Sequence, residues 1–194
     1  KARAQALRAL GEIESYELGA AVSYANNTKE TSLRSEATRL APKVKPVGAI
    51  NKLESVLAKG SVKEQQSALI ALGELKDSGA DKLLNKWLEK LIAKKVPAAL
   101  TLELLEAAAK RSDENIKAKL KSFNESRPDP RQNFFALEPY FETLEGGNAE
   151  KGKKVFYENV ALSCVRCHVI NGQGGEVGPV LDGIGAKFDR KYLL

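Results

Sequence analysis

Apolar residues recur at helical spacing through most of the first 126 residues. Ile50, Leu53 and Leu57 fall three or four positions apart, and Leu84 and Leu88 repeat that spacing further along. This is the pattern of amphipathic helices that each bury one face. The sequence therefore predicts an all-α fold for this part of the chain.

The helical pattern repeats at an offset of 31 residues. Segments beginning at residues 3, 34, 65 and 96 align without gaps and place a small residue at one shared position: Ala6, Ala37, Ala68 and Ala99. Small residues at a fixed position let neighbouring helices approach closely. A second amphipathic stretch follows each copy, and we expect the breaks between helices at Gly11, Gly60, Gly73, Gly79, Pro42, Pro46 and Pro97.

This organisation resembles HEAT-like repeats, an α-solenoid of stacked helix hairpins, over residues 1–126. The 31-residue offset is shorter than the ~40 residues usual in that class. The alternative is an irregular helical bundle in which the alanines align by chance.

A different segment follows at residues 127–146. Pro128 and Pro130 cannot continue a helix, because each removes a hydrogen-bond donor and restricts the residue before it. Phe134, Phe135 and several apolar residues up to Leu144 come next. We therefore expect a linker that is packed between two domains, with the second domain at residues 147–194.

Composition narrows the possible functions. Up to residue 127 there are 23 Lys and Arg against 16 Asp and Glu, and from residue 128 onward 8 against 9. Basic and acidic residues are mixed along the helices, as on a solvated surface, which argues against nucleic-acid binding. No apolar run reaches the roughly 20 residues that span a bilayer. The first residues already read as helix, so an export signal is expected to have been removed or to lie upstream.

Two cysteines and the single histidine form one motif, Cys164-Val-Arg-Cys167-His168. This is the signature of c-type haem attachment. Two thiols on one helical turn reach the vinyl groups on one porphyrin edge, and the following imidazole becomes the proximal ligand of the iron. A structural zinc site needs four ligands, and a thiol redox pair needs no histidine, so both alternatives are weaker.

Residues downstream of the motif extend this reading. Asn148 is predicted to cap a short helix that carries Gly152 and Phe156, and a Gly178-Pro179-Val-Leu181-Asp-Gly-Ile184-Gly segment follows the histidine. Residues 147–194 resemble the N-terminal part of a class I cytochrome c domain. The run from Cys164 to Leu194 resembles, more narrowly, the haem-binding domains of planctomycete- and verrucomicrobium-type secreted proteins, which often follow HEAT-like repeats.

The resemblance implies roles for individual residues. Gly152 and Phe156 would meet the last helix of the domain. The backbone carbonyl of Pro179 would accept a hydrogen bond from the outer nitrogen of His168. Gly178, Leu181 and Ile184 would complete the haem pocket, although ordinary core packing is a compatible reading for the last two.

The distal side of the iron has no obvious ligand. The sequence contains no Met and no second His, whereas class I domains usually supply a distal Met. We expect the distal part of the domain to lie outside these 194 residues. The alternative is an open iron that binds small ligands.

We therefore predict an exported, periplasmic module with one covalent haem c that transfers single electrons and is not itself an enzyme. A dehydrogenase domain or protein is the expected donor, and a further protein the expected acceptor. Two alternatives stay open: a helical-repeat scaffold that binds a protein partner, and an open-site haem sensor or peroxidase.

Overall fold

The computed structural model describes residues 2–127 and 137–194 and divides the chain into two compact units. The first unit comprises residues 1–146 and the second residues 147–194. Helices account for all the regular elements of the described residues, apart from one isolated β-bridge between Ile170 and Gln173. The all-α prediction is confirmed.

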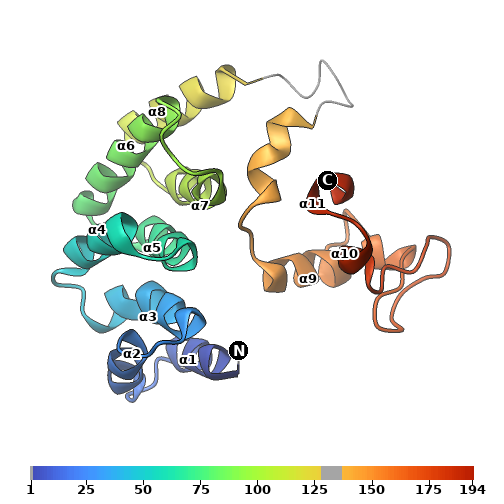
Figure 1. Ribbon diagram of the computed structural model, residues 1–194, viewed down its shortest axis with the longest axis horizontal. Helices are drawn as coiled ribbons and strands as arrows, with labels where there is room; N and C mark the ends of the chain where they lie inside the picture. The colour runs from blue at the N-terminus through green and yellow to red at the C-terminus, as the bar shows by residue number, and fades with distance from the viewer. Residues whose placement is uncertain (1, 128–136) are drawn as a thin grey trace. The chain divides into compact units, whose positions relative to one another are not determined.

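The first unit is built from successive helix pairs (Figure 1). Its helices are α1 (Ala2–Glu12), α2 (Leu18–Asn26), α3 (Thr31–Val44), α4 (Ala49–Lys59), α5 (Val62–Glu74), α6 (Ser78–Ile92), α7 (Ala98–Ala109), α8 (Glu114–Glu125) and the 3-10 helix η1 (Glu138–Leu144). The odd-numbered helices pack on one another in order, α1 on α3, α3 on α5 and α5 on α7. Each also packs on the even-numbered helix that follows it, so the unit has two layers.

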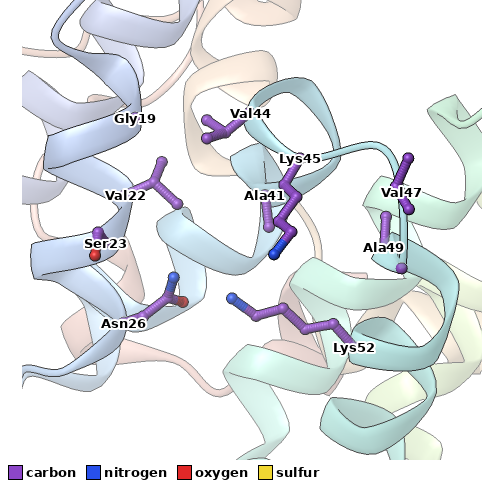
Figure 2. Close-up of a pocket in the computed structure, with 11 residues that line it drawn as sticks. Gly19, Val22, Ser23, Asn26, Ala41, Val44, Lys45, Val47, Ala49 and Lys52 are labelled. Atoms are coloured by element: carbon purple, nitrogen blue, oxygen red, sulfur yellow. The ribbon is translucent and has the colours of Figure 1, made fainter.

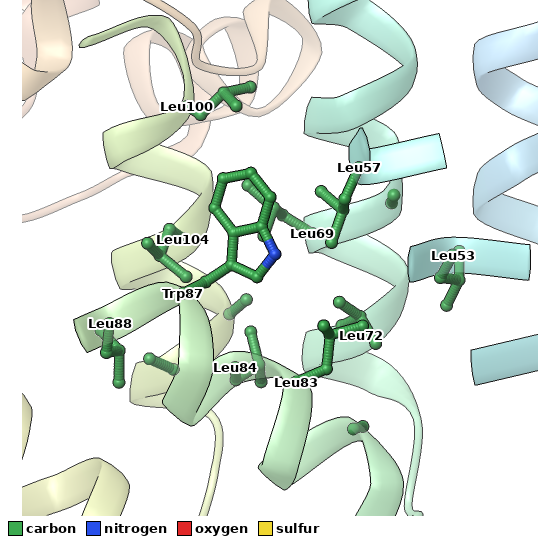
Figure 3. Packing of buried hydrophobic residues seen from close by; sticks show 14 of the residues in the cluster. Leu53, Leu57, Leu69, Leu72, Leu83, Leu84, Trp87, Leu88, Leu100 and Leu104 are labelled. Carbon is green, nitrogen blue, oxygen red and sulfur yellow. The ribbon is translucent and has the colours of Figure 1, made fainter. Parts of the chain in front are cut away.

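Leucines and alanines fill the space between the layers. The larger core cluster spans α4 to α8 and includes Trp87, whose ring lies among leucines from neighbouring helices (Figure 3). A smaller cluster joins α1, α2 and α3 around Leu7, Val22 and Leu40. The apolar faces that the sequence pattern predicted are therefore the faces buried between layers.

The repeated alanine position is buried only in the middle of the stack. Ala37 and Ala68 have no exposed surface, whereas Ala6 is exposed and Ala99 is half-buried. Ala37 on α3 and Ala68 on α5 each lie on a helix with an odd-numbered neighbour on both sides. The end helices lack one such neighbour, so the same residue stays accessible there.

Four of the seven expected helix breaks are wrong, because these residues lie inside helices. Gly11, Pro42 and Gly73 lie inside the last turns of α1, α3 and α5 and are buried. A Cβ on Gly73 would stand 2.8 Å from Cα of Ala107, so this glycine lets α5 and α7 touch. Gly79 lies in the first turn of α6 rather than before it. The remaining three lie at or between helix ends as expected: Pro46 between α3 and α4, Gly60 after α4 and Pro97 before α7.

Ion pairs join successive helix pairs at nearly the repeat distance. Arg8 reaches Glu36 (3.0 Å), Arg34 reaches Glu64 (2.7 Å) and Arg111 reaches Asp81 (2.6 Å). Glu64 also closes a capping box with Ser61 at the start of α5. The Arg34 guanidinium, together with the Ser61 hydrogen bonds, lowers the pKa of Glu64 to about 2.

The linker segment folds back onto the first unit where the structure describes it. Helix η1 packs on α7, and Arg127 pairs with Glu142 at 2.7 Å. Gly146 lies against the buried carboxylate of Glu103 on α7. Phe134 and Phe135, predicted as part of the packed linker, lie outside the described residues.

Candidate functional site

The second unit begins with a capped helix. Its elements are α9 (Ala149–Glu158), the 3-10 helix η2 (Cys164–Arg166), α10 (Ile184–Lys187) and α11 (Arg190–Leu193). The Asn148 side chain accepts hydrogen bonds from the amides of Glu150 and Lys151, which confirms the predicted N-cap. Near the other end of α9, the Tyr157 hydroxyl donates to the Ile170 carbonyl at 3.0 Å. This bond ties the helix to the segment just after the cysteine motif.

The cysteine motif is wound into a single tight turn. Ser163, with a left-handed φ of 49°, redirects the chain immediately before it. The amides of Cys167 and His168 both donate to the Cys164 carbonyl, at 3.2 and 3.1 Å. Both thiols are free of disulfide bonds. The two sulfur-bearing residues therefore sit one turn apart, with the imidazole directly after the second.

The loop of residues 173–181 is hydrogen-bonded along the motif. It starts after a two-residue turn in which Asn171 and Gly172 both have positive φ, the combination of a type I′ turn. The amides of Gly175, Gly178 and Leu181 then donate to three alternate carbonyls, at 2.8, 2.6 and 2.9 Å. Two of these belong to Val165 and Cys167 of the motif and the third to Val169 just after it. The Asp182 carboxylate accepts from the Asn171 amide at 2.8 Å and closes the far end of the loop.

Three glycines make this close contact possible. A Cβ on Gly174 would stand 2.0 Å from the His168 carbonyl oxygen, and one on Gly175 would stand 1.9 Å from the Arg166 carbonyl oxygen. A Cβ on Gly178 would stand 2.7 Å from Cε1 of the His168 ring. No side chain fits at these positions, because the obstacles are backbone atoms and a ring whose position is itself held.

His168 is held by Pro179. Nδ1 of the imidazole lies 2.9 Å from the Pro179 carbonyl oxygen. A carbonyl can only accept, so Nδ1 carries the proton in this bond. In the neutral ring Nε2 then keeps its lone pair and is the nitrogen that can bind a metal.

The apolar residues of the predicted haem pocket are only partly covered. Phe156, Leu181 and Ile184 are half-buried, and none of the described residues of the second unit is fully buried. The first unit, in contrast, has an extensive leucine core. The second unit thus has incompletely covered apolar residues, two thiols and an oriented imidazole. These features suit a large flat apolar group such as haem.

Gly152 has no close contact in the described residues. A Cβ at this position would meet nothing within 4 Å. The approach of another helix at Gly152, expected from the resemblance, is therefore not made by the described part of the chain.

Several residues that shape the site were not predicted. Gly174 and Gly175 permit the close contact with the motif, and Asn171, Asp182 and Tyr157 fix the ends of the adjoining segments. The Asn-Gly pair at 171 and 172 is a strong turn signal in the sequence and could have identified the turn. The Tyr157 and Asp182 contacts depend on tertiary geometry and leave no local signal.

The described residues contain no group of three or more His, Cys, Asp or Glu side chains arranged to hold a metal ion. Among the same residues, every helix is too short or too polar to cross a bilayer.

Comparison with known proteins locates the family resemblance in the second unit. No curated protein and no solved structure matches the chain. Residues 149–194 match the family model described as cytochrome c. The all-helical chain therefore carries a cytochrome c domain in its second unit.

Proposed function

We propose that the second unit transfers single electrons through one covalently bound haem c. A cytochrome c domain implies a covalently bound c-type haem, and the haem iron supplies the one-electron redox couple. The observation that carries the proposal is the contact between His168 and Pro179, 2.9 Å long, beside the two free thiols. It leaves Nε2 of His168 as an oriented ligand for iron.

Each residue of the site has a separate task in this proposal. Cys164 and Cys167 hold the porphyrin edge through thioether bonds, and His168 binds the iron. Pro179 fixes the tautomer and the orientation of the imidazole ring, which raises its strength as a ligand. Phe156, Leu181 and Ile184 exclude water from the porphyrin face, and burial of that kind tunes the redox potential.

We further propose that the distal ligand comes from outside these 194 residues. The sequence has no Met and no histidine other than His168. Electron transfer favours an iron with six ligands, because its geometry changes little between the two oxidation states. A thioether sulfur is the ligand that the class I resemblance implies for this position.

The cellular location and the redox partners are proposed from the resemblance and from general biochemistry. Attachment of haem c takes place outside the cytoplasm, so we propose an exported, periplasmic location. A dehydrogenase domain or protein is the proposed electron donor, and a further protein is the acceptor. The resemblance to planctomycete-type haem-binding domains that follow HEAT-like repeats supports this arrangement.

The stacked helix pairs favour a second role for the first unit. The odd-numbered helices pack on one another in sequence and form one layer of the stack. In repeat proteins such layers form extended surfaces for protein partners. We propose that the first unit is a HEAT-like scaffold that positions the haem unit near a redox partner.

The proposal is tested by producing the protein in cells that carry a haem c attachment system. Haem should stay with the polypeptide through acid–acetone extraction and a denaturing gel. Cys164→Ala with Cys167→Ala should abolish this retention, while His168→Ala should preserve it. Complete extraction of the colour from the wild-type protein would overturn the assignment.

Carbon monoxide distinguishes the carrier from the open-site alternatives. The reduced protein, with any further segments that it naturally carries, should remain low-spin and resist carbon monoxide. Rapid stoichiometric binding would favour a sensor or peroxidase over an electron carrier.

A further inference from the structure

The first unit contains a pocket that the proposed electron transfer does not use. It lies between α2, the end of α3 and the start of α4, with a volume of about 360 Å³ (Figure 2). The lining residues are Gly19, Val22, Ser23, Asn26, Ala41, Val44, Lys45, Val47, Gly48, Ala49 and Lys52. This volume is in the range of sites that hold small molecules.

The charge of the pocket has one sign. Of the described residues that line it, only Lys45 and Lys52 are ionisable, and none is acidic. Their ammonium ends point into the same space, with the Asn26 amide opposite (Figure 2). Among the described residues, no carboxylate forms an ion pair with either lysine. Two converging positive charges without a partner attract an anion.

The rest of the pocket wall is largely apolar. Val22, Ala41 and Ala49 are buried at its base, and the side chains of Val44 and Val47 stand at its edge. This environment removes part of the water around Lys52, and the resulting desolvation lowers the pKa of that ammonium. An anion bound in the pocket would restore the stabilisation that the Lys52 ammonium loses with this water.

The start of α4 adds to the positive potential. Helix α4 follows Gly48, which has a left-handed φ of 80°, and its first residue Ala49 also lines the pocket. The first turn carries no acidic residue and no side chain caps it. The positive end of the helix dipole therefore remains uncompensated beside the two lysines.

We propose that this pocket binds a small organic carboxylate, with its charged group between Lys45 and Lys52 and its apolar body against Val22, Ala41 and Val44. Asn26 and Ser23 supply further hydrogen-bonding groups at the same opening. The combination of two cations with an apolar wall distinguishes this ligand class from inorganic anions, which gain nothing from valines. The site lies in the first unit and does not depend on the haem assignment.

The test uses hexanoate as the probe, with hexylammonium, hexanol and inorganic phosphate as comparisons. Binding to the whole chain is measured by calorimetry and by amide shifts in two-dimensional NMR spectra. Hexanoate should bind with a Kd of about 1 mM, as expected for so small a ligand. Hexanoate should shift the amides of Ser23, Asn26 and Lys52. Its affinity should exceed that of each comparison compound by at least about fivefold.

The lysines provide the matched variants. Lys52→Gln and Lys45→Gln should each weaken hexanoate binding by about fivefold, because each removes one charge-assisted contact. Lys82→Gln removes an exposed positive charge from α6, outside the pocket, and should leave Kd unchanged. All three positions are exposed, so the variants should fold like the wild type.

Three outcomes would overturn the proposal. One is a hexanoate affinity that survives loss of both lysines. Another is equal binding of hexanoate and phosphate, since the apolar wall would then contribute nothing. The third is the absence of any pocket amide shift at 20 mM hexanoate, well above the Kd of about 1 mM expected for a ligand of this size.

Discussion

Replacing Gly175 by alanine should disrupt the loop that holds His168. A Cβ there would stand 1.9 Å from the Arg166 carbonyl oxygen and 2.7 Å from its carbon, whereas real Cβ atoms keep at least 3.0 Å. The loop must therefore shift by about 1.1 Å. The same shift stretches the bond from the Gly175 amide to the Val165 carbonyl from 2.8 Å to at most about 3.9 Å, which weakens or breaks this hydrogen bond.

The cost can be estimated from these two effects. Overpacking against a backbone atom costs about 1–3 kcal/mol, and the lost backbone bond adds about 1 kcal/mol. The loop should therefore lose about 2–4 kcal/mol of local stability. Since each 1.4 kcal/mol corresponds to a tenfold change, amide exchange in residues 173–181 should accelerate by roughly 30- to 700-fold.

Hydrogen exchange followed by mass spectrometry on the haem-bearing protein measures this directly. Gly185→Ala is the control, because a Cβ there meets nothing within 4 Å. It should leave exchange in the loop unchanged. Equal protection in Gly175→Ala, Gly185→Ala and the wild type would refute the close contact between loop and motif.

Four further changes test other parts of the structure. Ala68→Leu should overpack the middle of the stack and lower the free energy of unfolding, measured in urea, by about 1–3 kcal/mol. Ala6→Leu changes the equivalent position on α1, which is exposed, and should alter that free energy by under about 0.5 kcal/mol. Because the pKa of Glu64 is lowered to about 2, its contribution to stability should be present above pH 4.5 and fade as pH falls toward 2. Arg34→Gln should reduce this acid-induced loss of stability, measured in thermal melts at low pH, and an unchanged pH profile in the variant would contradict the ion pair. Gly152→Ala should stabilise α9 by about 0.5–1 kcal/mol, since nothing opposes the new methyl group, and a lower melting temperature would show that another segment packs there. His168→Ala should keep the haem attached but give high-spin iron, and an unchanged visible spectrum would identify another ligand.

The helices of the first unit were predictable because their apolar periodicity is strong. The positions of their ends were less so. Gly11 and Gly73 read as breaks, since glycine usually ends helices. In the structure they lie within the last turns of α1 and α5, where a side chain would collide with Leu40 or Ala107. A sequence shows that a glycine is present, but not whether it serves the backbone conformation or a neighbouring helix.

The chemistry of the second unit was predictable and its architecture only in part. Cys164, Cys167 and His168 are adjacent in the sequence, so their spacing alone indicates haem attachment. The role of Pro179 came only from the resemblance, because its carbonyl acts through the backbone and its identity gives no direct sign of it. Contacts such as Tyr157 with Ile170 join residues 13 positions apart and require the folded geometry.

The loop of residues 173–181 is anchored by hydrogen bonds at every third residue. Only every third amide, at 175, 178 and 181, is anchored to the motif or to the residue just after it, and the side chains in between face outward, with Val177 87% and Val180 60% exposed. The positions whose amides are anchored are thus different from those of the two exposed valines, although Pro179, whose carbonyl orients His168, is itself exposed. Substitutions at Val177 and Val180 can therefore remodel the surface that other molecules meet while the imidazole keeps its orientation, so recognition and ligand geometry can evolve independently along one short loop.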